Sequence, residues 1–222
     1  MMRVRFHQNL DGLKEKLLVM AGMAEQAIQR SIEAYRVRDL SICDLVLRSE
    51  PAINRMEREL DEMALDLLAM EQPMAIDLRF ILAVIKINAD LERVGDQAVN
   101  IAERVRALQS MPFVDLPVDV PKMASLAAAM VRSALQAFID ADADLANSVL
   151  TMDDQVDQMN RDTYRTLGQW ARDVPSQTQQ ALNVLLIARN LERVGDHATN
   201  IAEDVIFWVR GADVRHHVQT ES

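Results

Sequence analysis

The chain has 222 residues, of which 50% are hydrophobic and 4% aromatic, and its formal net charge is −10. A surface this acidic repels phosphate backbones and anionic lipids, so neither nucleic-acid binding nor membrane docking through a basic patch is expected. The single Cys43 excludes a disulfide framework within the chain, and the small number of glycines and prolines disfavours an all-β fold.

Apolar residues recur at helical spacing along almost the whole chain. Pro73 and Pro175 interrupt this pattern, and Gly211 is a plausible stop for the last helix. Three of the six prolines fall within residues 110–121, which makes this stretch the best linker candidate. Six helices are therefore predicted, at residues 6–36, 40–70, 76–109, 120–140, 143–172 and 177–209.

The N-terminus MMRVRFHQNL lacks the apolar run of a signal peptide. The longest apolar runs, at residues 80–85 and 205–209, are far shorter than the roughly 20 residues that cross a bilayer. We therefore expect a soluble, cytoplasmic protein that reaches a membrane only through its partners.

One segment of the chain is repeated. LERVGDQAVNIAERV, residues 91–105, recurs as LERVGDHATNIAEDV, residues 191–205, with twelve of fifteen positions identical. A weaker similarity links EPAINRMERE (50–59) to DDQVDQMNRD (153–162). The order helix, helix, proline-marked turn, motif helix thus occurs twice. We predict an all-α fold of two tandem, structurally similar three-helix bundles: a first repeat at residues 1–110, a linker at 111–118 and a second repeat at 119–222.

Each motif carries a glycine on the apolar side of its predicted helix. Gly95 and Gly195 each cost roughly 1 kcal/mol relative to alanine in a helix interior. Close approach of another helix, which a side chain would block, is the expected compensation. The inward-facing residues of the first copy are Leu91, Val94, Gly95, Ala98, Ile101, Ala102 and Val105.

The other face of each motif helix carries a row of oxygen-bearing side chains at four-residue spacing. Acids at i and i+4 repel each other, and the chain accepts that cost twice in the same register. A solvated acidic face is one interpretation; a cation site is the other. Oxygen ligands without Cys or His suit Fe(III), Mn, Mg or Ca better than structural zinc. The candidate metal ligands are Glu92, Asp96 and Asn100 in the first copy, and Glu192, Asp196 and Asn200 in the second.

Several other side chains have a plain structural interpretation. Arg93 and Arg193 are expected to pair with Asp96 and Asp196 within their helices, and an anion or partner contact is the alternative. His216 and His217 lie in a terminal tail. The aromatic residues Trp170, Trp208 and Tyr164 are expected in the core or at an interface. The sequence shows no nucleotide-binding loop, nucleophile elbow or zinc-hydrolase signature, so no enzymatic activity is expected.

The paired motifs LERVGDQAVNIAE and LERVGDHATNIAE resemble those of the PhoU family, the accessory and regulatory proteins of the bacterial phosphate-specific ABC transporter. The stretches DLRFILAVIKINADLERVGD (77–96) and NIAEDVIFWVRGADVRH (200–216) are also similar to that family. The two-repeat layout extends the resemblance over nearly the whole chain.

The resemblance implies a cytoplasmic, often dimeric protein that helps to repress the phosphate-starvation response when phosphate is ample. It implies two partners, the ATPase subunit of the transporter and the phosphate-sensing membrane histidine kinase. In some members of the family, Glu/Asp-x-x-x-Asp rows bind multinuclear iron or other metals, and these rows map onto the candidate ligands named above. Asn190 in place of Asp90, and Asp204 in place of Arg104, are expected to make the two sites unequal in charge.

Three classes of function remain open from the sequence. The favoured one is a signalling adaptor of phosphate transport. The second is a metal-binding helical bundle that stores or senses iron. The third is an enzyme of the di-metal carboxylate kind, against which the absence of inward Glu-x-x-His pairs counts.

Overall fold

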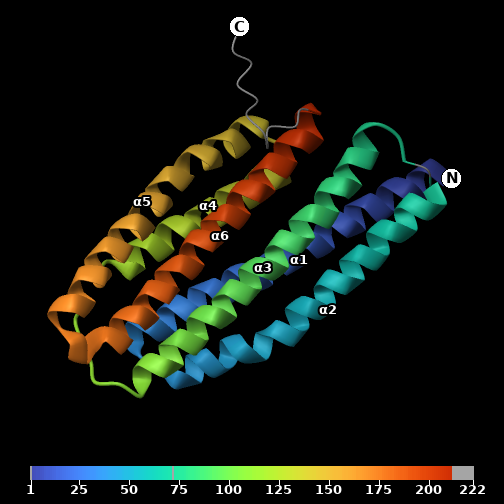
Figure 1. Ribbon diagram of the computed structural model, residues 1–222. Helices are drawn as coiled ribbons and strands as arrows, with labels where there is room; N and C mark the ends of the chain where they lie inside the picture. The colour runs from blue at the N-terminus through green and yellow to red at the C-terminus, as the bar shows by residue number, and fades with distance from the viewer. Residues whose placement is uncertain (1, 72, 212–222) are drawn as a thin grey trace, which may run out of the picture.

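The computed structural model describes residues 2–71 and 73–211, and no β-strand occurs within these ranges. Six long α-helices and one short 3-10 turn account for most of the described chain (Figure 1). The predicted helices are all present, and the first begins earlier than expected. The elements are α1 (Met2–Val37), α2 (Leu40–Glu71), α3 (Ile76–Gln109), α4 (Val120–Asp140), α5 (Ala143–Asp173), η1 (Pro175–Gln177) and α6 (Thr178–Arg210).

The helices form two three-helix bundles that lie side by side along their length. Figure 1 shows α1, α2 and α3 on one side, α4, α5 and α6 on the other, and the motif helices α3 and α6 adjacent at the centre. These two helices run in opposite directions. The predicted all-α fold of two tandem bundles is confirmed, and residues 110–119 connect the bundles without a helix.

Helix ends follow from local sequence. Asp119 caps α4 by accepting a hydrogen bond from the backbone N–H of Lys122 at 3.0 Å, and Asp142 caps α5 in the same way. Gly211 ends α6 with φ 70°, as predicted. Ala141 ends α4 with φ 51°, a left-handed conformation that is unusual for a residue with a Cβ.

An aromatic cluster joins the two bundles at one end. The Trp208 ring of α6 lies 5.1 Å from the Phe80 ring of α3 and 5.3 Å from the Phe138 ring of α4, between centroids. Nearby, the guanidinium of Arg79 donates to the carbonyl of Trp208 at 3.2 Å, which ties the start of α3 to the end of α6. Trp208 is thus an interface residue, as expected.

The other two aromatic predictions differ in outcome. Trp170 is half-buried, and its indole N–H donates to the side-chain oxygen of Gln177 at 2.9 Å. Tyr164 is 69% exposed, so it does not lie in the core, which was one of the two positions expected for it. The helical turn that carries Tyr164 instead places Thr163 and Leu167 toward the core. The predicted tail histidines, His216 and His217, lie outside the described residues.

No helix in the described part of the chain has both the length and the apolar character needed to cross a membrane.

Candidate acidic sites on the two motif helices

Both motif glycines lie where a second helix approaches closely. A Cβ added to Gly95 would lie 3.0 Å from Cδ1 of Ile53 on α2. A Cβ on Gly195 would lie 3.3 Å from Asp153 Oδ1 and 3.5 Å from Val156 Cγ1, both on α5. The predicted packing role is therefore confirmed. Ile53 and Val156 occupy the same place in the two bundles, as the similarity of residues 50–59 to 153–162 indicates.

The first acidic row faces α2. Glu92 and Asp96 are half-buried rather than fully exposed. Burial raises the pKa of the Glu92 carboxyl, and the neighbouring carboxylates of Asp96 and Glu57 raise it further. Burial also raises the pKa of Asp96, and burial and the neighbouring Asp61 raise that of Glu57. The structure thus brings Glu57 of α2 next to the predicted row.

The second acidic row faces α5 and is more crowded. Burial raises the pKa of Glu192, and the carboxylates of Asp196 and Asp157 raise it further. Burial followed by Asp157 raises the pKa of Asp196. The largest effect falls on Asp153, whose pKa rises to about 6 through burial and the charges of Asp157, Asp196 and Asp154.

Sequence reasoning did not single out Asp153, although a signal for it was present. Asp153 and Asp157 have the same four-residue spacing as Glu192 and Asp196, on a helix that belongs to the same repeat. Such spacing places both carboxylates on one face of α5. The closest contact at Gly195, made by Asp153 Oδ1, shows that this face is turned toward α6.

Buried oxygens without a hydrogen-bond partner in the described part of the chain include Asp153 Oδ1 on α5 and Asn54 Oδ1 on α2. A buried acceptor without a donor is costly, and a cation would satisfy it. Within residues 2–71 and 73–211, no three His, Cys, Asp or Glu side chains already converge as a ligand set for a metal ion. The rows are therefore sets of interacting carboxylates, and the only ligands that they provide for a cation are oxygens.

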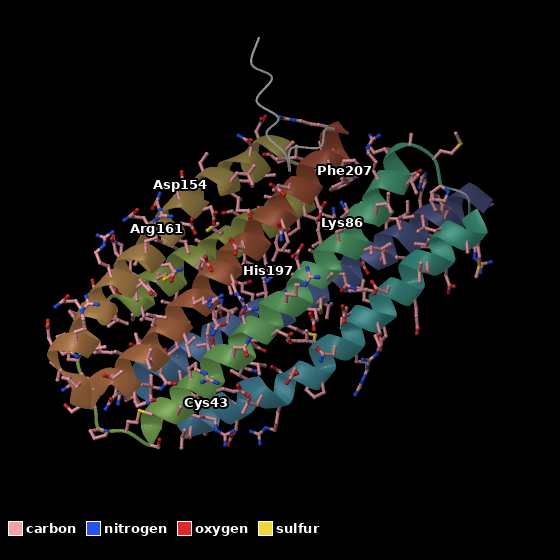
Figure 2. The ribbon with its side chains drawn as sticks, viewed as in Figure 1. Cys43, Lys86, Asp154, Arg161, His197 and Phe207 are labelled. Atoms are coloured by element: carbon pink, nitrogen blue, oxygen red, sulfur yellow. The ribbon has the colours of Figure 1, made fainter. Side chains whose placement is uncertain are left out.

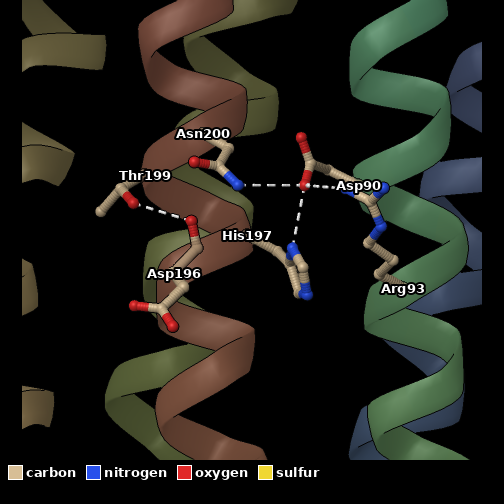
Figure 3. A network of polar contacts seen from close by, with 6 residues as sticks. All are labelled: Asp90, Arg93, Asp196, His197, Thr199 and Asn200. Atoms are coloured by element: carbon tan, nitrogen blue, oxygen red, sulfur yellow. Dashed lines mark hydrogen bonds and ion pairs between the residues drawn. The ribbon is translucent and has the colours of Figure 1, made fainter. Parts of the chain in front are cut away.

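Asn200, which ends the second predicted row, lies toward the interface between the bundles. Asn200 Nδ2 donates to Asp90 Oδ1 on α3 at 3.2 Å. Figure 3 shows the Asp196 carboxylate on the opposite side of α6 from this contact. Asn100, the counterpart of Asn200, is half-buried on α3. The amide nitrogen of Asn200 thus serves the interface, while the acids of its row face α5.

Asp90 is the centre of a polar network between α3 and α6 (Figure 3). The residue is 5% exposed, and its carboxylate lies 2.8 Å from His197 Nδ1. Arg93 approaches the same carboxylate at 3.7 Å, so the predicted pairing of Arg93 with Asp96 is wrong. Asp96, three residues after Arg93 on α3, projects toward α2 instead, where Glu57 lies.

A second ion pair crosses the same interface. Lys86 Nζ lies 3.0 Å from Asp204 Oδ1, and Asp204 is 5% exposed. Figure 2 shows Lys86 beside Phe207, and the ammonium lies 5.4 Å from the centre of that ring. The departures between the copies, Asp90 to Asn190 and Arg104 to Asp204, therefore alter the bundle interface. These two departures were expected to make the acidic rows unequal in charge. The structure shows instead that Asp90 and Asp204 contact the opposite bundle.

Comparison with known proteins gives consistent results. The PhoU domain profile matches residues 17–105 and again residues 120–205. The phosphate-specific transport system accessory protein PhoU homologue of Pseudomonas aeruginosa is 39% identical over 215 residues, covering 96% of this chain and 88% of that protein. The homologue of Clostridium acetobutylicum is 32% identical, covering 96% of this chain and 98% of its own.

Solved structures are similar in fold. The crystal structure of PhoU from Pseudomonas aeruginosa superposes with a TM-score of 0.90 at 37% identity, covering 93% of this chain and all of the other. The phosphate transport system regulatory protein PhoU from Streptococcus pneumoniae superposes with a TM-score of 0.85 at 25% identity. With both halves of the chain matched and the whole fold shared, this protein belongs to the PhoU family.

Proposed function

We propose that this chain is an accessory protein and negative regulator of phosphate transport and phosphate-starvation signalling. The observation that carries the proposal is the similarity to phosphate-specific transport system accessory proteins over 96% of the chain. It acts by binding, with contacts to the ATPase subunit of the phosphate transporter and to the phosphate-sensing histidine kinase. It works in the cytoplasm as a homodimer. Sedimentation analysis of the purified protein tests the dimeric state.

The shape of the molecule supports a binding role. Two bundles side by side offer helical faces more than 30 residues long, suited to docking partner domains. The net charge of −10 favours partners with basic surfaces, mainly by steering encounter and orientation. Association is therefore expected to weaken as salt concentration rises.

The acidic rows are proposed to hold hard cations such as Fe, Mn, Mg or Ca. Support comes from the pKa of Asp153, raised to about 6 by its burial and by neighbouring carboxylates, and from its unpartnered Oδ1. Glu192, Asp196 and Asp157 would hold the ion with it, and Glu92, Asp96 and Glu57 would do so in the first bundle. A bound cation would supply positive charge that relieves the repulsion among these carboxylates. Asn100 and Asn200 are proposed to add a side-chain oxygen, which for Asn200 requires its amide to turn away from Asp90.

Deletion of the gene tests the regulatory role. In cells grown with ample phosphate, loss of a negative regulator should switch on a phosphate-starvation reporter. Restoring the wild-type chain should silence the reporter again. A silent reporter and unchanged phosphate uptake in the deletion strain would reject the proposal.

Metal content tests the role of the acidic rows separately. We expect Asp96→Ala/Asp196→Ala to lose most of the iron or manganese that wild type binds in titration and elemental analysis. Asp66→Ala/Asp140→Ala removes the same charge from exposed positions, one in each bundle, and should retain wild-type content. Equal metal content in all three proteins would refute the assignment.

The second candidate function is storage or sensing of iron, favoured by the crowding of carboxylates around Asp153. Under this alternative, metal content changes with iron supply while the phosphate reporter does not respond to deletion. The two experiments above therefore separate the candidates.

A further inference from the structure

A groove between α5 and α6 collects arginines on an otherwise acidic molecule. Its volume is about 650 Å³, within the range of small-molecule sites. Arg161, Arg165 and Arg172 line it from α5, and Arg189 lines it from α6 beside Glu192, the first acid of the second row and the one carboxylate among the lining residues. Figure 2 shows Arg161 on α5, at the outer edge of the second bundle.

The three arginines of α5 form one stripe. Arg165 follows Arg161 by four residues, and Arg172 follows Arg165 by seven. At about 100° per residue, these steps keep all three side chains within a narrow arc of the helix. The stripe extends roughly 16 Å along the axis, at about 1.5 Å per residue. A single tetrahedral anion cannot reach from end to end, whereas an extended anion can.

The partners of these arginines are weak and exposed. Arg161 pairs with Asp157 at 3.1 Å and Arg165 with Asp162 at 3.4 Å, and the arginine side chains are 56% and 77% exposed. Surface ion pairs of this kind contribute about 0–1 kcal/mol. A ligand with higher charge density can therefore replace them at little cost.

The floor and rim of the groove leave room for a ligand. A Cβ added to Gly168 would have no atom within 4 Å, so the space above this glycine is open. Leu185 of α6 adds an apolar surface, and the exposed ring of Tyr164 lies at the rim. Arg165 and Arg172 also line a neighbouring hollow against Pro117, so these two side chains stand on the ridge between both hollows.

The first bundle lacks this feature at the duplicated positions. By the alignment that equates Ile53 with Val156, Glu62 and Ala69 stand where Arg165 and Arg172 stand in the second bundle. The motif repeat places Ala89 opposite Arg189 in the same way, and only Arg58 matches Arg161. The arginines are thus not needed to build the shared fold, and they mark a role of the second bundle alone.

We propose that this groove binds a linear polyphosphate anion, either free or as the phosphate chain of a nucleotide. The arginine fork matches phosphate oxygens in pairs, and the stripe repeats that match along the groove. The small volume favours such a ligand over an acidic protein segment. This inference stands on the groove alone and does not depend on the proposed regulatory function.

Calorimetric titration of the purified chain at low salt tests the proposal, with EDTA present so that no metal on the acidic rows bridges to the ligand. The probes are tripolyphosphate, ATP and orthophosphate, with sulfate and an oligoglutamate peptide as other anions. We expect saturable binding of tripolyphosphate, one per chain, that weakens with added salt. Equal binding of ATP would show that the phosphate chain suffices, whereas much tighter binding of ATP would identify a nucleotide as the ligand.

The variant Arg165→Ala/Arg189→Ala should lose affinity by roughly tenfold or more, because two charge-assisted contacts disappear. Arg55→Ala/Arg58→Ala makes the same charge change on exposed positions of α2 and should bind within about twofold of wild type, as expected for substitutions away from a site. Absent binding, equal affinity in both variants, or equal binding of oligoglutamate would overturn the proposal. These outcomes would leave the reporter experiment untouched.

Discussion

The two bundles share a backbone plan but differ in what surrounds the motif helix. In the first, the motif glycine meets the aliphatic side chain of Ile53; in the second, the closest atom is a carboxylate oxygen of Asp153. Beyond the glycine, the first bundle carries Glu62 where the second carries Arg165. The comparison teaches that the helix crossing is common to both copies, while the charges along α2 and α5 have diverged.

The interface between the bundles has diverged as well. Asp90 accepts from His197 and Asn200, whereas the duplicated position carries the uncharged Asn190. The largest effect of a substitution is therefore expected here. Asp90→Ala should lower the free energy of unfolding by about 2 kcal/mol, because His197 and Asn200 of the opposite bundle lose the buried carboxylate that accepts from them.

The control for Asp90→Ala is Asn190→Ala, which should cost less than about 1 kcal/mol because no buried carboxylate is lost there. Urea unfolding at neutral pH measures both. Equal losses would mean that the network around Asp90 contributes nothing specific to the joining of the bundles.

The glycine pair gives the next effect in size. Replacing Gly95 with alanine gains about 1 kcal/mol of helix propensity but forces a core side chain to move, at about 1–3 kcal/mol. We expect a net loss near 1 kcal/mol. In Gly195→Ala the new Cβ would lie 3.3 Å from Asp153 Oδ1 and 3.5 Å from Val156 Cγ1. The gain in helix propensity and the cost of the tighter packing should therefore nearly cancel. Thermal unfolding followed by circular dichroism compares them, and a larger loss for Gly195→Ala would contradict the packing described for the two crossings.

Asp153 provides a comparison that depends on pH. Its pKa of about 6 lies above the ordinary value of 3.8, so the folded state binds this proton more tightly than the unfolded state. The contribution of Asp153 to the free energy of unfolding is fully present below about pH 4 and is lost as pH rises through about 6. In the absence of metal, Asp153→Asn should therefore stabilise the protein at pH 7 by about 1 kcal/mol after allowing for solvent screening.

That gain should vanish near pH 4, where wild-type Asp153 is protonated as well. Glu50→Gln changes the counterpart carboxyl on α2, whose longer side chain reaches solvent, and should alter stability by only a few tenths of a kcal/mol. Unfolding curves across this pH range, in EDTA, measure both variants. A gain for Asp153→Asn that is independent of pH would exclude the carboxylate charge as its cause.

The smallest effect concerns the arginine common to both copies. Arg161 pairs with Asp157 one turn before it, while its counterpart Arg58 has the uncharged Asn54 at that position. Arg161→Ala should cost about 0.3–0.5 kcal/mol, and this cost should disappear in high salt. Arg58→Ala should show no such salt-dependent loss. Chemical denaturation in low and high salt resolves the difference if both variants are compared with wild type.

Helix positions and the inward motif stripe could be predicted because they depend on local periodicity and on proline and glycine signals. The packing role of Gly95 and Gly195 followed from the same reasoning, since a glycine inside a helix needs compensation. The crowding around Asp153 was accessible through its spacing to Asp157, but how closely this face of α5 approaches α6 depends on the crossing of two helices, which the spacing on one helix does not give.

The contacts of Asp90 could not be predicted from the sequence. They depend on how α3 crosses α6, and helix-face reasoning describes one helix at a time. The same limit applies to Tyr164, whose hydrophobic ring suggested a buried position while the rotation of α5 leaves it at the rim of a groove. Metal binding to the acidic rows stays a prediction.

The antiparallel contact of α3 with α6 has a consequence for symmetry. If two identical bundles associated through this surface as a dimer, each cross-contact would occur twice, since residue i would meet j and j would meet i. Here Asp90 contacts Asn200 and His197, while the same antiparallel register sets Asn190 against Asn100, so the contact between the Asp90 carboxylate and the histidine occurs only once. Covalent linkage of the repeats thus frees an interface from self-complementarity, and one half can specialise while the other preserves the fold.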